Sequence, residues 1–574
     1  MKVGGGIHLV LLLCFILYTV VAIKALPYDH SASIECLAEP LKPQYRGGII
    51  VNSEFNHGLK GWSVFGKGKI EKRISNEGNS FIVAHSRNNK YDSFSQKLHM
   101  KAGNHYTFSA WIQVSKGSSH VSAVLKTQSG YKTVGTVAAE SGCWSMLKAG
   151  FSVNASGPAE LYFQSENTGV EIWVDSVSLQ PFTKEEWRSH QDQNVQKARK
   201  SVVKIQAKTP QGETLAGAKI SIKQTQAGFP FGTAINKTIV DNTAYQNWLT
   251  SRFTVATFAN EMKWYSTEYI QGKEDYSASD AMLNFAKQHG ISIRGHNIFW
   301  DDPTYQPSWA KSVPPYQLRE GVERRVNSVV KRYAGQLIAW DVVNENLHFS
   351  FFEDKFGKNF TALMFQKTHM IDPQTTLFMN DYNTLEESRD DKSFPAVYLQ
   401  KLREIQSVQE KNTQLAIGCE GHFSSTPNIP YMRSSLDTLA AAGVPIWITE
   451  LDLENSPNQA QHLEELLREA HSHPAVKGVV LWTASYPNEC NKMCLTDNNF
   501  RNLPTGDVVD KLLHEWTQKN VVGVTDDNGF FETSLFHGEY EVTIHHSAES
   551  SSSPQNFKVE PTEATQEHKI YVQL

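Results

Sequence analysis

Short hydrophobic runs separated by polar stretches recur along the 574-residue chain, and their period changes from one region to the next. From about residue 47 to 182, apolar and polar residues alternate in runs such as HYTFSAWIQV, AELYFQSE and VEIWVDSVSL. Alternation with a period of two, bounded by turn residues, predicts strands that bury one face. Because no long helical stripe interrupts these runs, we expect an all-β sandwich over residues 47–182.

A different pattern begins after a charged stretch, KEEWRSHQDQNVQKARK, which we expect to form a linker or helix over residues 183–201. Over residues 229–518, short apolar runs alternate with stretches of helical period, for example QHLEELLREAHSH. This alternation is typical of repeated βα units and a parallel sheet. The apolar runs number eight, which is the number that closes a (β/α)8 TIM barrel. They cover residues 229–235, 253–260, 291–300, 337–345, 376–383, 415–423, 445–452 and 477–483.

Alternation with a period of two returns on both sides of the predicted barrel. Residues 202–224 read VVKIQAKTPQGETLAGAKISIKQ, and residues 521–574 contain GVTDDNGFFETSLFHGEYEVTIHH with a turn at Asp527–Gly529. We expect these two flanking segments to pair into one small accessory β-sandwich beside the barrel.

The N-terminus predicts export. Lys2 precedes an apolar run from Ile7 to Ile23, with small residues around Ala22 and Ala25. This pattern favours a secretory signal peptide over residues 1–25, with a short membrane anchor as the alternative. We therefore expect a secreted protein that acts outside the cell or in the cell wall.

Cysteines and glycosylation sequons are compatible with that compartment. Cys490 and Cys494 are close enough in sequence for a local disulfide, whereas Cys36, Cys143 and Cys419 have no assigned partner. The predicted N-glycosylation sites are Asn154, Asn236 and Asn359.

The charge balance of the chain excludes some classes of partner. The chain has 55 Lys and Arg against 60 Asp and Glu, for a formal net charge of -5. This balance gives no positive surface for nucleic acid or for an anionic membrane. We expect a neutral partner such as a sugar, no nucleic acid, and no membrane once the signal peptide is cleaved.

Polar and aromatic side chains collect at the carboxyl ends of the eight predicted strands. In a (β/α)8 barrel these ends converge on one face, where the loops build the active site. We therefore expect the following residues to share one cleft: Asn260 and Lys263 (run two), His296 and Trp300 (run three), Asn344 and Glu345 (run four), His422 (run six), Glu450 (run seven) and Trp482 (run eight).

Glu345 and Glu450 are the natural catalytic pair for a glycosidic bond, which is cleaved by two flanking carboxyl groups. They end the apolar runs AWDVVNE and PIWITE on strands four and seven, so they can face each other across the barrel mouth. One must be protonated and the other ionised, but the residues alone leave both assignments open. A separation of about 5 to 5.5 Å would make the enzyme retaining.

Each neighbouring residue has a functional and a structural interpretation. Asn344 could donate to the sugar 2-hydroxyl, and His422 could orient Glu450 and hold it ionised. Trp482 fits a stacking floor for a sugar ring better than a core residue. His296 is a sugar ligand or a buried barrel histidine, and Lys263 is a ligand or a surface lysine.

These motifs resemble glycoside hydrolase family 10, the endo-1,4-β-xylanases, and most closely its plant members. WDVVNE resembles the acid/base motif and ITELD the nucleophile motif, and NEMKW, RGHNIFW, NDYN, GHF and LW occur in the same order. The resemblance implies that Glu345 is the acid/base, that Glu450 is the nucleophile and that catalysis needs no cofactor or metal. It also implies that sugars on the non-reducing side bind the following residues: Asn260, Lys263, His296 and Trp482, with Trp300 beside them.

The sequence departs from the family pattern at three places. Ala259 stands where the family usually has Glu, and a lost hydrogen bond of that kind costs about 1 to 3 kcal/mol. Glu420 stands where microbial members generally have Gln. The microbial loop after strand eight is replaced by the Cys490–Cys494 stretch.

The N-terminal sandwich resembles carbohydrate-binding module family 22, a xylan-binding jelly roll, through GLKGWSVFGKG, AHSRNNKYDSFSQKL and ELYFQSENTGVEIWVDSVSL. The resemblance implies ligand contacts at Arg87, Tyr91 and Tyr162. Tyr91 and Gln164 stand where such modules usually have Trp and Glu, so binding is expected to be weakened or redirected. The resemblance also allows a structural calcium, which no motif in the sequence demonstrates.

Together these features predict a monomeric, secreted endo-1,4-β-xylanase that acts on cell-wall xylan by double displacement with retention. A xylan endotransglycosylase would use the same residues, with a sugar hydroxyl in place of water. The alternative of another class is a xylan-binding wall protein with weak or no turnover, which the missing carboxylate at Ala259 motivates.

Overall fold

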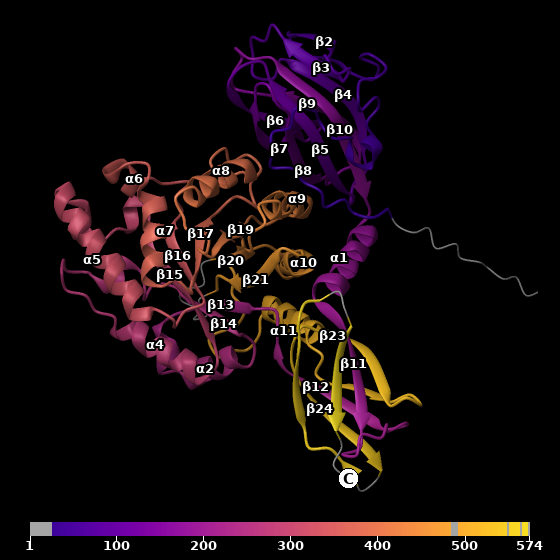
Figure 1. The fold of residues 1–574 in the computed structure, drawn as a ribbon. Helices are drawn as coiled ribbons and strands as arrows, with labels where there is room; N and C mark the ends of the chain where they lie inside the picture. Colours follow the sequence, from indigo (N-terminus) through magenta and orange to yellow (C-terminus); the bar gives the residue numbers. More distant parts are fainter. Residues whose placement is uncertain (1–25, 484–491, 548–549, 563–564, 572–574) are drawn as a thin grey trace, which may run out of the picture.

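The computed structural model describes residues 26–483, 492–547, 550–562 and 565–571, which form three parts: an N-terminal sandwich, a barrel and a small sandwich built from segments on both sides of the barrel (Figure 1). The predicted signal peptide and Cys490 lie outside the described residues. Among the residues that are described, no helix combines the length and hydropathy needed to cross a membrane.

The N-terminal part is a sandwich of two five-stranded antiparallel sheets, as predicted. Phe94, Phe108 and Phe163 belong to its buried core between the sheets. One sheet has the order β1 (Ser63–Phe65), β4 (Ser93–Met100), β9 (Gly157–Gln164), β6 (Ser118–Thr127) and β7 (Gly130–Glu140). The other has the order β2 (Lys69–Ile74), β3 (Ser80–His85), β10 (Ile172–Phe182), β5 (His105–Val114) and β8 (Ser145–Ser152).

The central part is a closed barrel of eight parallel strands, and each strand coincides with one of the eight predicted runs. The strands are near-continuous buried segments such as VATF and AWDVVN, because a parallel sheet covered by helices buries both faces. In order they are β13 (Phe231–Ile235), β14 (Val255–Phe258), β15 (Ser292–Trp300), β16 (Ala339–Asn344), β17 (Thr376–Asp381), β18 (Leu415–Cys419), β20 (Ile446–Leu453) and β21 (Val476–Leu481). Pairing of β21 with β13 closes the ring, and the two-residue β19 (His422–Phe423) adds to β20.

Helices surround the barrel. The longer ones are α2 (Thr243–Thr250), α4 (Ser277–Gln288), α5 (Pro315–Tyr333), α7 (Phe360–Ile371), α8 (Pro395–Gln406), α9 (Ile429–Ala440), α10 (Gln459–Ser472) and α11 (Pro504–Trp516). Short turns around the barrel are α3 (Trp264–Thr267), α6 (Phe351–Phe356) and the 3-10 helices η2 (Lys237–Val240), η3 (Pro303–Tyr305) and η4 (Ser308–Lys311). The 3-10 helix η1 (Gln44–Gly47) instead lies against β10 of the first sandwich.

The two segments that flank the barrel pair with each other, as the alternation predicted. They form the small accessory sandwich, and its buried core includes Ile205, Ile220, Leu535 and Tyr540. In one sheet β11 (Lys200–Lys208) lies between β23 (Phe530–Phe536) and β27 (Gln566–Tyr571). In the other, β12 (Lys219–Ala227) lies between β22 (Val521–Val524) and β24 (Gly538–Ser547), with β25 (Ser550–Ser551) and β26 (Gln555–Val559) beyond β24.

The charged stretch after the first sandwich is a helix, α1 (Lys184–Ala198). Thr183 and Glu186 form a capping box, in which the Thr183 hydroxyl accepts the Glu186 amide and the Glu186 carboxylate accepts the Thr183 amide. Trp187 is buried and its Nε1 donates to Glu469 Oε2 of α10 at 2.7 Å. The stretch is therefore docked on the barrel.

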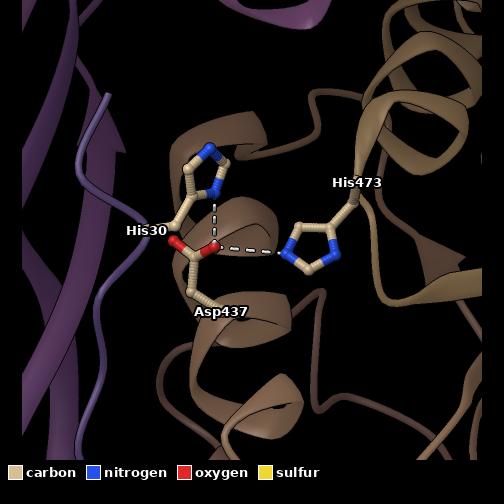
Figure 2. A group of neighbouring side chains, drawn as sticks. All are labelled: His30, Asp437 and His473. Carbon is tan, nitrogen blue, oxygen red and sulfur yellow. Dashed lines mark hydrogen bonds and ion pairs between the residues drawn. The ribbon is translucent and has the colours of Figure 1, made fainter. Parts of the chain in front are cut away.

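Buried charges fix the first sandwich to the barrel. Asp437 of α9 accepts the Tyr28 hydroxyl at 2.7 Å, and Lys148 Nζ of β8 lies 3.1 Å from Asp437 Oδ2. His30 and His473 approach its other oxygen at 3.3 and 3.1 Å (Figure 2). Burial raises the pKa of Asp437, but these partners outweigh it and hold the pKa well below its usual range. A buried carboxylate is tolerated here because it is paired on all sides.

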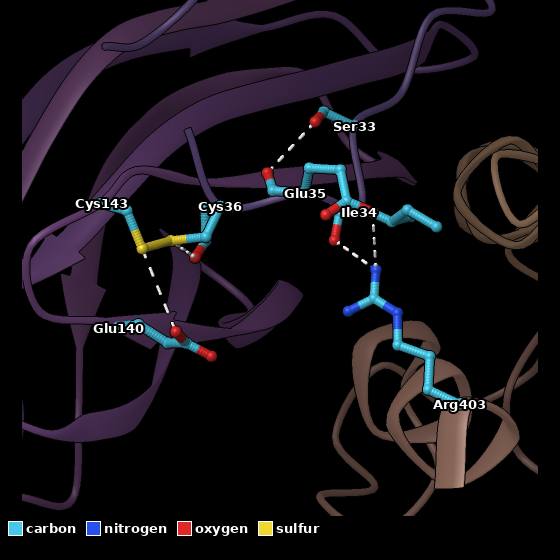
Figure 3. Close-up of a disulfide and its surroundings, with 8 residues drawn as sticks. Ser33, Ile34, Glu35, Cys36, Glu140, Cys143 and Arg403 are labelled. Carbon is cyan, nitrogen blue, oxygen red and sulfur yellow. Dashed lines mark hydrogen bonds and ion pairs between the residues drawn. A yellow bond between two sulfur atoms is a disulfide. The ribbon is translucent and has the colours of Figure 1, made fainter. Parts of the chain in front are cut away.

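A disulfide that the sequence did not predict ties the N-terminal segment to the same sandwich. Cys36 and Cys143 are bonded, with 5.3 Å between their Cα atoms and a sequence separation of 107 (Figure 3). Beside it, Arg403 of α8 donates to the Ile34 carbonyl at 2.8 Å. Cys494 is also disulfide-bonded, but the predicted pairing with Cys490 stays a prediction.

The three sequons differ in accessibility. Asn154 and Asn359 are exposed, which suits a glycan. Asn236 is only 4% exposed, and its Oδ1 accepts the Thr238 amide at 3.0 Å as the N-cap of η2. The prediction of a glycan at Asn236 is therefore wrong for the folded protein, because the side chain has no room for one.

Candidate active site

Two carboxyl groups stand at the carboxyl ends of strands β16 and β20. Glu345 follows β16 directly in a left-handed conformation with φ of 58°, and its amide donates to the Asn380 carbonyl at 2.9 Å. Such a backbone is strained for a residue other than glycine and is found at functional sites. Glu450 lies within β20, and its amide donates to the Glu420 carbonyl at 2.8 Å.

Two histidine rings lie beside Glu450. His296 Nε2 lies 3.7 Å from Glu450 Oε1, and His422 Nε2 lies 3.5 Å from Glu450 Oε2. Burial raises the pKa of Glu450, but His296, His422 and Lys263 together outweigh this effect and lower the pKa to about 2. Glu450 is therefore an ionised carboxylate, as a nucleophile must be.

Both histidines are held by acidic partners. His296 Nδ1 lies 2.8 Å from Asp341 Oδ2, and Asp341 in turn pairs with buried Arg294 at 2.7 Å. His422 Nδ1 lies 2.9 Å from Asp452 Oδ1. Because one nitrogen of each ring faces an acid, the other nitrogen is directed toward Glu450.

Glu345 has the opposite environment. Burial raises its pKa to about 8, and the negative charges of Asp381 and Glu450 add to the shift, whereas Trp300 and Lys263 oppose it. Glu345 is therefore protonated at neutral pH and can donate a proton. Two carboxyl groups with pKa values driven apart by their surroundings are the signature of an acid and its partner base or nucleophile.

Glu420 is a third carboxyl group in the same cluster. It is buried, and its Oε2 lies 3.4 Å from His422 Nε2. Burial, with the charges of Glu450 and Glu345, raises its pKa well above the usual range. Glu420 is therefore neutral beside the ionised Glu450.

Asn380, which the sequence reasoning assigned no role, joins these groups. Its Nδ2 donates to Asn344 Oδ1 at 2.9 Å, and to Glu450 Oε1 and Glu420 Oε1 at 3.2 Å each. Its Oδ1 accepts the Thr449 hydroxyl at 2.5 Å, which fixes the orientation of the amide. The signal in the sequence was the NDYN stretch at the end of the fifth run.

Lys263 and two tryptophans form one wall of the cluster. Lys263 is 5% exposed, and its Nζ lies 4.3 Å from the ring centroid of Trp300 and 5.7 Å from that of Trp482. The ring of Trp482 also packs edge-on against His296 at 5.4 Å. Burial excludes the alternative of a surface lysine, and aromatic faces of this kind suit the apolar faces of sugar rings.

Comparison with known proteins agrees with this geometry. The sequence matches the family description "Glycosyl hydrolase family 10" over residues 221–504 and "Carbohydrate binding domain" over residues 47–169. "Endo-1,4-beta-xylanase 5-like" from Arabidopsis thaliana is 39% identical over 536 residues, covering 92% of this chain and 91% of that protein. The chain belongs to glycosyl hydrolase family 10.

Other relatives of this family 10 protein are similar over most of its length. "Endo-1,4-beta-xylanase 5" from Arabidopsis thaliana is 38% identical, covering 94% of this chain and 93% of that protein. Among solved structures, xylanase 10B from Thermotoga petrophila in complex with xylobiose is 22% identical, with a TM-score of 0.45, covering 50% of this chain and 94% of that one.

The remaining predicted barrel residue lies at the edge of the family 10 cleft. Asn260 is exposed, and its Oδ1 accepts the Tyr265 hydroxyl at 2.6 Å. Ala259 is 7% exposed and offers no polar atom of its side chain to a ligand. The structure thus brings the predicted barrel residues together, with Asn260 at the rim.

The carbohydrate-binding domain presents aromatic rings on one face. Tyr162 stacks on Phe65 at 4.0 Å, with Tyr91 and Tyr131 edge-on to this pair at 6.4 Å. Tyr91 and Tyr131 are 41% and 68% exposed, and the Tyr162 hydroxyl donates to Gln164 at 3.4 Å. Phe65 and Tyr131 were missed because single aromatic residues in alternating strands look alike in sequence.

Arg87 does not belong to this face. It is 6% exposed, and its five N–H groups donate to five backbone carbonyls, so none remains for a sugar. The prediction of a ligand contact at Arg87 is therefore wrong, and its role is to hold loops together. The acceptors belong to Lys90, Asp92, Ser165, Asn167 and Val170.

Three groups of described side chains have the spacing of metal ligands, but their neighbours do not suit a cation. Glu420, His422 and Glu450 already face Lys263, and the pKa of His422 is raised by its acidic partners, so this ring carries the positive charge itself. The second group, His30, Asp437 and His473 (Figure 2), adjoins Lys148, whose Nζ lies 3.1 Å from Asp437 Oδ2. The third group, in the carbohydrate-binding domain, is Cys36, Glu140 and Cys143. The two cysteine sulfurs are joined in a disulfide. This group does not fit the calcium that the family resemblance allows, because calcium prefers oxygen ligands.

Proposed function

We propose that this family 10 protein is an endo-1,4-β-xylanase that hydrolyses internal bonds of cell-wall xylan by a retaining double displacement. The observation that carries the proposal is the contrast between the surroundings of two neighbouring carboxyl groups. Buried Glu450 lies 3.7 Å from His296 and 3.5 Å from His422, which lower its pKa, whereas desolvation and nearby acidic groups raise the pKa of half-buried Glu345. The named xylanase relatives, which cover more than nine-tenths of the chain, support the substrate.

In the first step Glu450 attacks the anomeric carbon and Glu345 gives its proton to the leaving oxygen. A bond forms between the sugar and Glu450 while the glycosidic bond breaks, and the reducing-end portion leaves as an alcohol. Asn344, whose Nδ2 lies 3.4 Å from Glu345 Oε1, is placed to donate to the sugar 2-hydroxyl during this step.

In the second step Glu345 accepts a proton from water, and the oxygen of that water displaces Glu450 from the sugar. Glu345 thus changes from general acid to general base, and loss of the negative charge on Glu450 favours this change. While Glu450 is esterified it carries no charge, so the repulsion that helped to raise the pKa of Glu345 is gone. Glu345 can then remain ionised until it receives the proton of the attacking water.

The first experiment follows new reducing ends when the secreted protein acts on soluble glucuronoxylan and arabinoxylan. We expect release in the wild type and its loss in Glu450→Ala, with Glu454→Ala as a matched control because Glu454 is an exposed carboxylate beyond the same strand. Longer products without new reducing ends would identify a transglycosylase. Binding without either change would identify a xylan-binding wall protein.

We also propose that the aromatic face of the carbohydrate-binding domain binds xylan through Tyr91, Tyr162 and Gln164, with Phe65 and Tyr131. The exposure of Tyr91 and Tyr131 supports this role. In an affinity gel that contains xylan, Tyr91→Ala should migrate faster than the wild type, and it is preferred to Tyr162→Ala because Tyr162 is only 4% exposed. Tyr316→Ala, which removes an exposed tyrosine at the start of α5 of the barrel, is the control.

Export and organisation complete the proposal. We expect a chain cleaved near residue 25, found outside the cell or in the wall as a monomer. The parts are the carbohydrate-binding domain (47–182), a connecting helix (183–201), the catalytic barrel (229–518) and the accessory sandwich (202–224 with 521–574). N-terminal sequencing of the secreted protein and light scattering test these expectations.

A further inference from the structure

The loop between β17 and α8, residues 382–394, lies between the candidate active site and the carbohydrate-binding domain. It follows Asn380 and Asp381, and it leads into α8, a barrel helix that contacts strand β7 of this domain (Figure 1). Its side chains make contacts in both directions.

Toward the active site, the loop holds the backbone that carries His422. Glu386 Oε1 accepts the amides of Gly421 at 3.0 Å and of His422 at 2.9 Å. Gly421 has φ of 86°, and a Cβ atom there would lie 2.9 Å from the Ile448 side chain, so the position requires glycine. Glu386 thus fixes the turn from which His422 reaches Glu450.

The same loop braces the turn that carries Glu345. Asp390 Oδ2 lies 2.9 Å from His348 Nε2, and His348 Nδ1 lies 2.5 Å from Asp381 Oδ1. The amide of His348 donates to the Glu345 carbonyl at 3.2 Å. Asp390 therefore acts on the Glu345 turn through His348.

Toward the carbohydrate-binding domain, the loop rests on strands β6 and β7. The Ser388 hydroxyl donates to the Thr133 carbonyl at 2.8 Å, and the ring of Phe394 packs edge-on against His120 at 4.9 Å. The domain is itself fixed to the barrel at Asp437, as described above. The loop is thus supported by a rigid neighbour.

We propose that the carbohydrate-binding domain stabilises the geometry of the catalytic centre through this loop. By supporting Ser388 and Phe394 it holds the loop in place, and Glu386 and Asp390 act as positioning residues for His422 and Glu345. This inference rests on the proposed function. A displacement of about 1 Å at catalytic groups can reduce the rate 100-fold, so partial loosening should be measurable in kcat.

The test uses the full chain and a short substrate, an aryl β-xylobioside, which separates positioning from capture of long xylan. His120→Ala combined with Ser388→Ala removes the support. Asn428→Ala is the matched control, because Asn428 Nδ2 donates to the Gly150 carbonyl of the same domain at 3.2 Å, and this bond does not involve the loop. We expect kcat to fall by about three- to tenfold in the double variant with KM within twofold, and no change in the control.

Hydrogen exchange gives a second measurement that does not depend on turnover. The amides of Gly421 and His422, which donate to Glu386, should exchange faster in the double variant and not in Asn428→Ala. Equal exchange in the two variants overturns the inference, and so does faster exchange with unchanged kcat. A wild type that does not cleave the xylobioside refutes the proposed function instead, and the exchange measurement then decides the positioning role alone.

Discussion

Glu345, Glu420 and Glu450 have the same side chain but three different environments. Glu450 faces His296, His422 and Lys263, which lower its pKa, whereas burial and like charges dominate at the other two. Since one pKa unit corresponds to about 1.4 kcal/mol of differential interaction, the neighbours rather than the glutamates decide the chemistry.

The pH dependence of catalysis follows from the two directions of shift. Activity requires Glu450 ionised and Glu345 protonated, so kcat/KM rises as pH increases through the pKa of Glu450, near 2, and falls as pH increases through that of Glu345, near 8. We expect a broad plateau in a pH–rate profile on soluble xylooligosaccharides. Loss of half the activity between pH 5 and 6.5 on the alkaline side would contradict this account.

Glu345 should also lower stability at neutral pH. Its pKa is higher in the folded state than in the unfolded chain, so the folded state binds more protons between pH 4.5 and about 8, and the unfolding free energy falls as pH rises through that range. Glu345→Gln removes the titration and should raise the melting temperature more at pH 8 than at pH 4. The expected gain is about 1 to 3 kcal/mol at the upper end.

A melting temperature of Glu345→Gln that is unchanged or lower at pH 8 would contradict the raised pKa. Glu454→Gln, at an exposed carboxylate, is the control and should change neither pH dependence nor stability.

Sequence could predict the residues that end apolar runs, because a carboxylate there needs a special environment. It could not predict Glu386, which sits among charged residues in NTLEESRDD and looks like a surface residue. It also could not predict that Arg87 is a buried structural residue and not a ligand contact. That role depends on five backbone carbonyls, three of which lie more than 70 residues away in the sequence.

At the scale of elements, the strands of the barrel were predictable because each is a short run buried on both faces. The structure of the connecting stretch, which could have been a linker or a helix, is decided by its N-terminal capping box and by Trp187, which docks on α10. Only the capping signal, Thr followed three residues later by Glu, can be read from the sequence.

Removal of the cap tests this element. Thr183→Ala leaves the Glu186 amide without its acceptor, so we expect the unfolding free energy to fall by about 1 kcal/mol. Urea unfolding followed by tryptophan fluorescence measures the change. Ser189→Ala removes a hydroxyl in the interior of the same helix and should cause no such loss; an equal loss in both variants would exclude a capping effect.

At the scale of the whole molecule, the Cys36–Cys143 disulfide closes a 107-residue loop around most of the carbohydrate-binding domain. Sequence could not assign it, because pairing between distant cysteines depends on which strands come together. Its position beside the contact between Ile34 and Arg403 links it to the barrel as well (Figure 3).

Replacement of both cysteines by serine should lower the stability of this domain by about 2 to 4 kcal/mol. The double variant is preferable to a reducing agent, which would also reduce the disulfide of Cys494. Differential scanning calorimetry should show the first transition at a lower temperature, whereas Glu140→Ala, an exposed neighbour of the pair, should leave it unchanged. A transition that does not move would show that the bond adds nothing to stability.

The accessory sandwich has a consequence for how the protein is made. Ala218, just before β12, bonds to Thr525, 307 residues later in the chain, and β11 and β12 have their partners beyond the barrel. At about 5 to 20 residues per second, a ribosome needs roughly 15 to 60 seconds to supply those partners. During that interval two strands with open edges are exposed beside a barrel that is still being synthesised. A polypeptide released before residue 521 leaves both strands permanently unpaired, so loss of this C-terminal segment should leave the newly made enzyme bound to chaperones.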